Sequence, residues 1–218
     1  SKLRHPEDGI KISAVIFAIV LLVHSITLTQ PTQNNIRLGV MSGIETQNIE
    51  LVKKYAWRHF KLPIQIVQFN DYSLPNRALN AGDIDVNLFQ HQPFLDADKK
   101  AHDYTIKTIA KTFVYPLSFY SLTVKNISNL PDNAKVAIAN DPTNEGRALL
   151  LLAKHGIIKI DRTKGELVTV HDILQNPKHL HFTTLTAATL PRILKDADLV
   201  AINNDFIKTL TKLFFLFL

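Results

Sequence analysis

The chain has 218 residues with a net charge of +6, is 46% hydrophobic and contains no cysteine. This hydrophobic fraction favours a packed globular protein over a disordered one, and the lack of cysteine excludes disulfides, thiolate metal sites and cysteine nucleophiles. The basic residues are scattered, and pairs such as Lys53-Lys54 and Lys99-Lys100 are typical of solvated helix faces, so we expect no nucleic-acid partner.

The first segment of the chain, residues 1–34, is predicted to be a signal or anchor segment followed by a linker. Basic residues, among them Arg4 and Lys11, precede the uncharged stretch 12–23. A short apolar region after positive charge is typical of a secretory signal. The alternative is an uncleaved anchor, since residues 10–28 are just long enough to span a membrane. Both interpretations predict export to the periplasm, with the protein associated with the cell envelope or released.

The next part of the chain alternates between strands and helices. Strands are predicted at 36–40, 63–69 and 84–89, because these stretches are short and apolar. Helices are predicted at 45–60, from apolar residues at helical spacing, and at 73–82, with Ser73 as a cap and Gly82 as a stop. Such alternation predicts right-handed parallel units in an α/β sheet.

The second half repeats this alternation. The predicted strands are 135–140, 166–170, 180–185 and 198–203, and the predicted helices are 142–155, ended by Gly156, and 187–194, limited by Pro191. A crossover near 115–124 would divide the chain into lobe I (35–118) and lobe II (119–203), followed by a return segment (204–218). A cleft between two such lobes is a favoured site for a small ligand.

Arg147 lies near the N-terminus of the predicted helix 142–155, where the helix dipole disfavours a cation. Asp141 can cap this helix and Pro142 suits its first position. The free backbone donors of the first turn and the Arg147 guanidinium together predict a carboxylate site. An equally good interpretation is an ion pair between Arg147 and a nearby acid such as Glu145.

Polar and aromatic residues follow three of the predicted strands. Tyr72 comes after one strand, Phe89 and His91 after another, and Asn203 and Asn204 after a third. Ligands of α/β sheets bind outside the carboxyl ends of the strands, so these side chains predict an apolar slot with a polar end. The alternatives are core packing for Phe89, a helix cap for His91 and a closed turn for the asparagines.

At these positions the sequence resembles the NlpA family of lipoproteins, the methionine-binding subunits of ABC importers. The resemblance covers residues 36–206 and rests on several motifs in order, which are FNDYSLPN, ALNAGDIDVNLFQHQPFL, VAIANDPTNEGRALLLLAKHGIIKI, DILQNPKHLHF and AATLPRILKDADLVAIN. It implies a two-lobed periplasmic-binding-protein fold that traps L- or D-methionine between its lobes, without catalysis, metal or cofactor. The implied partners are the ABC permease and its ATPase.

The resemblance also implies which residues bind methionine. In the family, one group lines the pocket for the thioether side chain and another holds the amino-acid backbone. The matching residues are Tyr72, Phe89 and His91 for the side chain, Asn144 and Arg147 for the backbone, and Asn203, with Tyr120 as a further residue facing the cleft.

The sequence departs from the family in three places. Ser25 stands about where the family has its lipid-bearing cysteine, which excludes lipid anchoring if this N-terminus is native. Tyr115 and Ser118 replace an acidic residue and a glycine near the crossover, with an expected effect on the hinge. The match stops near Phe206, and the apolar residues 214–218 resemble a truncated end that leaves lobe I incomplete.

Two other functions compete with methionine transport. A truncated remnant of such a binding protein would bind methionine weakly or not at all. An enzyme on the same fold would use His91 with an acid such as Asp83 or Asp85, because general acid–base catalysis needs such a pair within hydrogen-bonding distance. We expect no enzyme, since the sequence contains no activated nucleophile, phosphate loop or metal cluster.

Overall fold

The computed structural model describes residues 35–113 and 115–207 and the backbone of a strand at 214–217. Our predictions for the signal, anchor and linker at 1–34, including Ser25, lie outside the described residues. Within the described ranges, none of the helices combines the length and hydrophobicity needed to span a bilayer.

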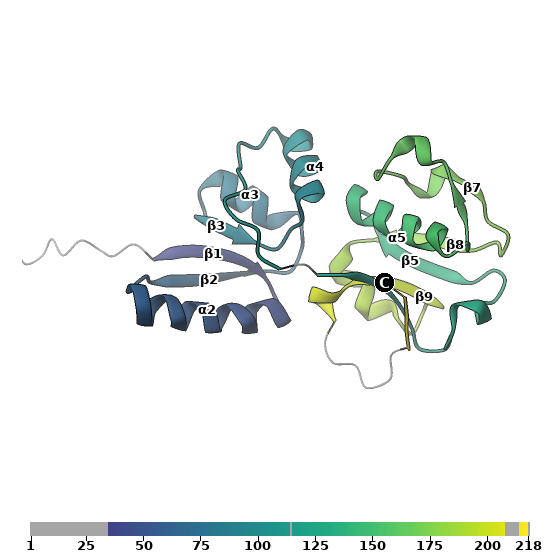
Figure 1. Ribbon diagram of the computed structural model, residues 1–218, viewed down its shortest axis with the longest axis horizontal. Helices are drawn as coiled ribbons and strands as arrows, with labels where there is room; N and C mark the ends of the chain where they lie inside the picture. The colour runs from purple at the N-terminus through teal and green to yellow at the C-terminus, as the bar shows by residue number, and fades with distance from the viewer. Residues whose placement is uncertain (1–34, 114, 208–213, 218) are drawn as a thin grey trace, which may run out of the picture. The chain divides into compact units, whose positions relative to one another are not determined.

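The first sheet has three parallel strands in the order β2-β1-β3. Helix α2 packs against β1 and β2, and α3 packs against β1 and β3, so that the helices lie on both faces of the sheet (Figure 1). The predicted parallel units are therefore confirmed, and strand β3 is shorter than expected. The bounds are β1 Ile36–Met41, α2 Ile44–Phe60, β2 Ile64–Phe69, α3 Leu74–Ala81, β3 Val86–Leu88 and α4 Gln92–His102.

The ends of α3 agree only partly with the sequence prediction. Gly82 ends the helix in the left-handed conformation, with φ of 81°, as a glycine stop should. Ser73 occupies the N-cap position, but its side chain makes no capping hydrogen bond. Its hydroxyl donates instead to Asp71 Oδ1 at 2.7 Å. The prediction of a serine cap was wrong because a closer acceptor in the preceding turn binds the hydroxyl.

The second sheet has five strands in the order β10-β4-β9-β5-β8. Strand β5 is parallel to β8 and β9, whereas β4 is antiparallel to both β9 and β10, so the sheet is mixed. The bounds are β4 Leu117–Ser121, β5 Lys135–Ala139, α5 Pro142–Lys154, β8 His181–Leu185, β9 Leu199–Asn203 and β10 Phe214–Phe217. A separate pair consists of β6 Lys159–Ile160 and β7 Ile173–Gln175, and the 3-10 turns are η1 Ile127–Asn129, η2 Arg162–Lys164, η3 Val170–Asp172, η4 Ala187–Ile193 and η5 Asn204–Phe206.

The predicted strand at 166–170 does not form. This segment lies against α5, where a Cβ on Gly146 would clash with the Glu166 carbonyl oxygen. The Val170 amide donates to Glu145 Oε1 of the same helix at 3.0 Å. The alternating sequence therefore reflects a segment that covers a helix, with Val168 buried and Leu167 exposed, and not a strand in a sheet.

The main hydrophobic core belongs to the second sheet and α5. It includes Phe119, Ile138, Leu149, Leu152 and Leu199, all fully buried. The cluster of the first sheet is much smaller, with Leu38, Val40 and Ile49 as its buried members. Core burial therefore anchors α5, and with it Arg147, more firmly than the elements of the first sheet.

The chain passes from the first sheet to the second between α4 and β4, and it approaches α2 again through η5. The backbone of β10 pairs with β4 at the edge of the second sheet. The division into 35–118, 119–203 and 204–218 stays a prediction.

Candidate functional site

The Arg147 guanidinium lies near the N-terminus of α5, and hydrogen bonds hold it to neutral groups. Its Nη1 donates to Asn144 Oδ1 at 2.9 Å and its Nη2 to the Tyr115 carbonyl oxygen at 3.5 Å. Asp141 caps the helix, as predicted, by accepting from the Asn144 amide at 3.0 Å. Glu145 accepts from Val170, and Arg147 forms no ion pair with any residue in the described ranges, so the predicted Arg147–Glu145 alternative was wrong.

Burial governs the electrostatics of Arg147. It lowers the pKa of the guanidinium, while the nearby Tyr72, Asp141 and Asp205 act in the opposite direction. A half-buried cation without a direct anionic partner costs desolvation free energy. The site is therefore suited to an incoming carboxylate, which a guanidinium binds through two parallel hydrogen bonds.

Asn203 ends strand β9 next to Asn144. Its Nδ2 donates to Asn144 Oδ1 at 3.0 Å. Its own Oδ1 is buried and has no hydrogen-bond partner among the described residues. Buried polar atoms are nearly always hydrogen-bonded in native proteins. The side-chain Oδ1 of Asn203 is thus an acceptor to which an N–H group of a ligand could donate.

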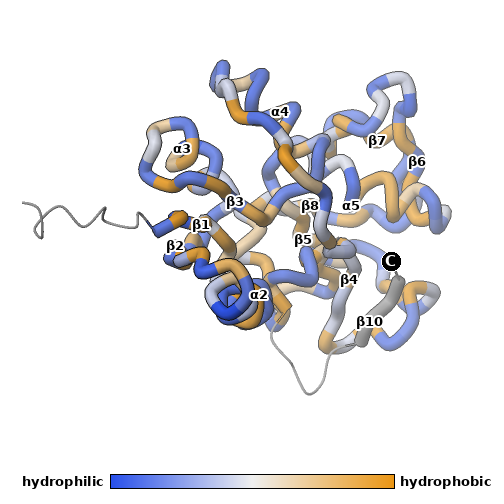
Figure 2. Tube along the Cα trace, turned by 60° about the vertical axis from the view of Figure 1, so that its left-hand side comes forward, coloured by the Kyte–Doolittle hydropathy of each residue, from blue (hydrophilic) through white to orange (hydrophobic). Residues whose placement is uncertain are grey.

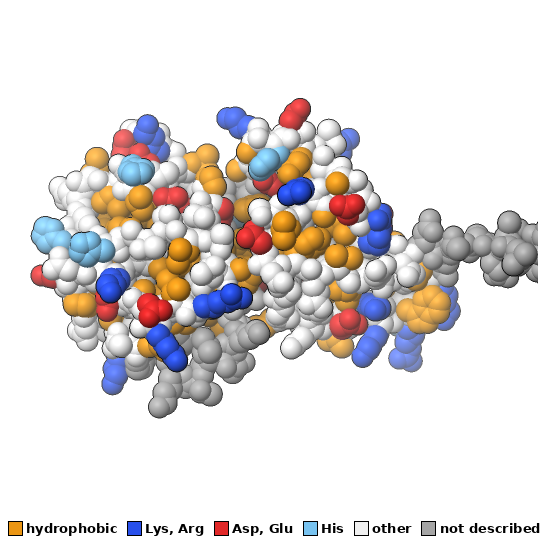
Figure 3. Space-filling model, turned by 180° about the vertical axis from the view of Figure 1, so that it is seen from behind, with side chains coloured by type: hydrophobic (Ala, Val, Ile, Leu, Met, Phe, Trp, Pro, Cys, Tyr) orange, Lys and Arg blue, Asp and Glu red, His pale blue; other side chains and the backbone are white. Residues whose placement is uncertain are grey.

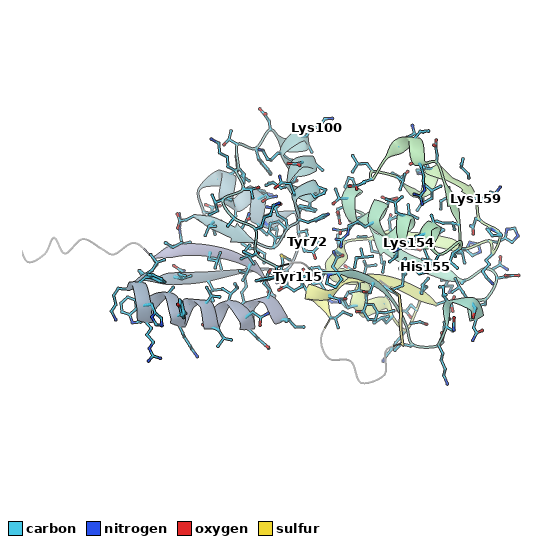
Figure 4. All side chains as sticks on the ribbon, viewed as in Figure 1. Tyr72, Lys100, Tyr115, Lys154, His155 and Lys159 are labelled. Carbon is cyan, nitrogen blue, oxygen red and sulfur yellow. The ribbon has the colours of Figure 1, made fainter. Side chains whose placement is uncertain are left out.

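Four aromatic rings meet at the ends of the strands and form what we call the aromatic cluster. The Tyr72 ring centroid lies 5.8 Å from that of Phe89, 5.8 Å from Phe94 and 5.0 Å from Phe206. Phe89 and Phe94 are 5.7 Å apart in an edge-on arrangement. The cluster combines residues near the first sheet with one from η5, and Figure 4 shows Tyr72 between the two sheets. Its rings supply apolar surface near the strand ends, where the sequence predicts an apolar slot, but none of the four lines the cavity between α4 and α5.

Two buried carboxyl groups lie next to this cluster. The Tyr72 hydroxyl donates to Asp205 Oδ2 at 2.6 Å, and burial followed by the Asp205 charge raises the pKa of Tyr72 well above its ordinary value. Burial also raises the pKa of Asp205 to about 6, against the opposing effects of Tyr72 and Arg147. The pKa of Glu45 rises to about 8, mainly through burial, although its Oε2 accepts from the Met41 amide at 2.7 Å.

His91 occupies the N-cap position of α4, but its side chain makes no capping hydrogen bond, so the predicted alternative of a helix cap was wrong. Its ring lies 6.4 Å from Phe94. Burial, with a smaller effect from Arg147, lowers the pKa of His91 to about 4, so that the imidazole is neutral near pH 7. Asp85 is bound to Arg37, and His91 has no carboxylate partner within the described ranges.

A cavity of about 680 Å³ lies between α4 and α5. His91 and Arg147 both line it, which brings together two of the predicted site residues. Lys100 and Lys154, labelled in Figure 4, belong to its walls. Tyr72, Phe89, Asn144, Asn203 and Tyr120 do not line this cavity. Asn144 and Asn203 connect to it through hydrogen bonds that lead to Arg147, and Tyr72 and Phe89 connect to it through Phe94, whose ring is near His91.

Tyr120 packs within the second hydrophobic cluster of the second sheet, and only 6% of its surface is exposed. Its hydroxyl donates to Asn204 Oδ1 at 2.6 Å, beside Asn203. Tyr120 thus contacts the neighbourhood of the site through its hydroxyl, and its ring belongs to a core cluster against which Tyr72 and Phe206 pack.

Comparison with known proteins places this chain in a family. The NlpA lipoprotein profile matches residues 36–213. The chain belongs to the NlpA lipoprotein family. It is 43% identical over 202 residues to the probable D-methionine-binding lipoprotein MetQ of Haemophilus influenzae, covering 88% of this chain and 74% of the relative. It is 46% identical over 175 residues to the D-methionine-binding lipoprotein MetQ of Escherichia coli K12, covering 79% and 65%.

Among solved structures, a nutrient-binding protein from Burkholderia cenocepacia, bound to methionine, has a TM-score of 0.76 and 42% identity, covering 78% of this chain and 72% of that one. The predicted α/β fold of a periplasmic binding protein is therefore confirmed. The family consists of solute-binding proteins and not of enzymes, as we expected. The chain spans roughly two thirds to three quarters of the length of these relatives.

Sequence reasoning missed several residues of the site. Phe94 lies one helical turn after His91, and Asp205 follows Asn203 by two positions. Both lie close enough to a strand end to have been predicted as site residues. Asn76 gave no such signal. Its fully buried amide donates to Gln90 Oε1 at 2.7 Å and to Asp98 Oδ2 at 2.8 Å, and thereby holds the segment that carries Phe89 and His91.

Proposed function

We propose that this protein is the solute-binding component of an ABC importer and that it captures methionine in the periplasm for delivery to the permease and its ATPase. The observation that carries the proposal is Arg147. Its guanidinium is half-buried and has no ion-pair partner in the described ranges. The chain that carries it belongs to a family whose relatives are described as methionine-binding. Delivery then follows from closure of the protein around its ligand.

The carboxylate and the ammonium of methionine each have a suitable partner. The carboxylate pairs with Arg147, whose guanidinium is positioned by Asn144. The Asn203 Oδ1 accepts from the ammonium, since this oxygen is buried without another donor in the described ranges. An amino acid zwitterion thus provides a partner for both the Arg147 guanidinium and Asn203 Oδ1. A simple anion provides a partner for the guanidinium alone.

The thioether side chain lies in the aromatic cluster. Sulfur is polarizable, and each contact between sulfur and an aromatic ring contributes about 0.3–1.5 kcal/mol. The neutral imidazole of His91, which has a pKa lowered to about 4, adds a polar group without a charge that an apolar side chain would have to desolvate. Tyr120 supports the site from the core through Asn204.

Titration calorimetry with L-methionine and D-methionine tests the proposal. We expect at least one enantiomer to bind, and Arg147→Ala to weaken binding by at least about 30-fold, the loss typical of removing one partner of a buried charge pair. Arg162→Ala is the matched control, because Arg162 is exposed on η2 and should leave affinity unchanged. Norleucine, with a methylene in place of sulfur, should bind about 2- to 12-fold more weakly.

Failure would take two distinguishable forms. A folded protein that binds neither enantiomer would contradict the function and favour the alternative of a remnant without ligand binding. Binding that Arg147→Ala leaves intact would contradict the assigned carboxylate site alone.

A further inference from the structure

Helix α2 exposes an unusual number of large hydrophobic side chains. Leu51 is 66% exposed and Phe60 71%, and Tyr55 and Trp57 are also largely exposed. We call these four residues, together with Lys54 and Arg58, the outer surface of α2. Soluble proteins rarely gather such residues on one element unless a partner covers them.

The core does not need this surface. The buried face of α2 is formed by Glu45, Ile49 and Ala56, and the helix packs through that face against β1, β2 and η5. In Figure 2, which shows α2 nearly end-on, hydrophobic and hydrophilic residues both occur on its turns. The outer surface is therefore separate from the face through which α2 packs on the first sheet.

Cations and aromatic rings alternate over the outer surface. Lys54, Tyr55 and Arg58 lie three, four and seven residues after Leu51, which places the four on one face of the helix, and Trp57 lies one turn before Lys61. The Lys61 ammonium is 5.8 Å from the centroid of the Trp57 ring. Figure 3 shows Lys and Arg side chains beside exposed hydrophobic ones at the end of the molecule that α2 occupies.

The charge on the exposed side of α2 is strongly one-sided. Lys54, Arg58 and the C-cap residue Lys61 are exposed cations and Lys53 is half-buried, whereas Glu50 is the one exposed carboxylate of the helix. Two copies of this chain would bring these cations together, and like charges across an interface are repelled. An anionic surface is complementary instead. Trp and Tyr prefer the boundary between lipid headgroups and acyl chains, where Lys and Arg bind lipid phosphates.

We propose that the outer surface of α2 binds the surface of a membrane that contains anionic phospholipid. The helix lies parallel to the membrane, with Leu51 and Tyr55 among the headgroups, Trp57 at the edge of the same face, and Lys54 and Arg58 at the phosphates. Phe60 leaves the helix on another side and joins this face through its ring, whose centroid is 6.1 Å from that of Tyr55. This interaction is independent of methionine binding and of residues 1–34. It holds the first sheet against the membrane.

Trp57 is the single tryptophan of the chain and reports on α2 directly. With the full chain and vesicles of phosphatidylethanolamine and phosphatidylglycerol, we expect Trp57 emission to shift to shorter wavelengths and to be quenched by brominated lipid. Vesicles of phosphatidylcholine alone should cause little change. Because the signal comes from α2, binding through residues 1–34 alone would not produce it.

Charge-reversal variants separate this surface from the net charge. Lys54→Glu with Arg58→Glu should reduce the partition coefficient, followed by Trp57 emission, about tenfold or more. Arg162→Glu with Lys164→Glu removes the same charge from exposed positions on η2 and should have little effect. Leu51→Ser with Phe60→Ser should abolish quenching, with the far-ultraviolet circular dichroism unchanged.

Three results would overturn the proposal. The first is an equal loss of partitioning in the Arg162 and Lys164 variant, which would mean non-specific attraction. The second is an unchanged Trp57 spectrum with anionic vesicles. The third is a spectral shift that depends on protein concentration without lipid, which would identify a second copy of the chain as the occupant.

Discussion

Strands β4 and β9 of the second sheet are buried along their whole length, whereas β2 and β3 of the first sheet are largely half-buried. The two regions therefore position their site residues differently. Asn144, Arg147 and Asn203 lie on elements held by a large apolar core. Phe89 and His91 lie on a segment held by side-chain hydrogen bonds and ring contacts. The rigidity of the segment beside the first sheet thus depends on polar side chains that must all be hydrogen-bonded.

Substitutions in the two cores test this comparison most strongly. Leu149→Ala should lower the free energy of unfolding by about 2–5 kcal/mol, because Leu149 is fully buried in the large cluster. Ile66→Ala, on half-buried β2, should cost less than half as much. Urea denaturation followed by circular dichroism measures both. Equal losses would mean that the first sheet is as firmly packed as the second.

The polar network around Asn76 gives the next largest effect. Asn76→Leu removes the amide group that donates to Gln90 and Asp98. A buried polar group left without a hydrogen bond costs about 1–3 kcal/mol of stability. Methionine affinity should also fall, since Gln90 lies between Phe89 and His91. Asn80→Leu on the same helix is the control, because Asn80 is exposed and the exposed Thr105 amide, which donates to it at 3.2 Å, can bond to water instead. An unchanged affinity in Asn76→Leu would show that the network has no role in positioning the site.

Much of the fold could be predicted because local signals and tertiary packing agree. Helix α5 has a capping aspartate, a proline at its first position and a run of leucines, and it forms as expected. The segment 166–170 could not be predicted, because its fate depends on Gly146 in a helix that is distant in the sequence. Its alternating pattern is the same for a strand and for a segment that covers a helix.

The candidate site was predictable to a similar degree. Residues at strand ends became candidates because the topology places ligands there, and Arg147 because of its place at the start of α5. Asn144 and Tyr120 became candidates only through the family resemblance. Glu45 was not identified from the sequence, since an acidic residue in the first turn of a helix usually lies in solvent and interacts with the helix dipole. Its burial results from β1 and η5, which meet the start of α2 only in the folded chain. Burial of a charge by distant elements leaves no local pattern.

Glu45 makes the boundary between the two regions sensitive to pH. Its pKa is raised from 4.5 in the unfolded chain to about 8 in the folded protein. The folded state therefore binds more protons, and the free energy of unfolding falls as pH rises from about 5 to 8. Asp205, with a pKa of about 6, contributes in the lower part of this range with the same sign.

Glu45→Gln should remove most of this decline and stabilise the protein by at least about 1 kcal/mol near pH 8, because the neutral amide is not penalised by burial. Glu50→Gln, exposed on the same helix, is the control and should keep the wild-type slope. Unfolding curves at several pH values measure the effect. A wild-type stability that does not decline with pH would contradict the buried, protonated Glu45.

Tyr120→Phe should give the smallest effect, because it removes only one hydroxyl group from the better-packed second sheet. The hydroxyl donates to Asn204 Oδ1, and a hydrogen bond of this kind contributes about 0.5–1.5 kcal/mol to the free energy of unfolding. The ring stays in the hydrophobic cluster, so Arg147 and Asn203 should keep their positions and methionine affinity should change far less than in Arg147→Ala. Calorimetry beside urea denaturation separates the two effects. A large loss of affinity with little loss of stability would move Tyr120 from the supporting core into the binding site itself, and the second region would then contribute a fourth side chain to the ligand.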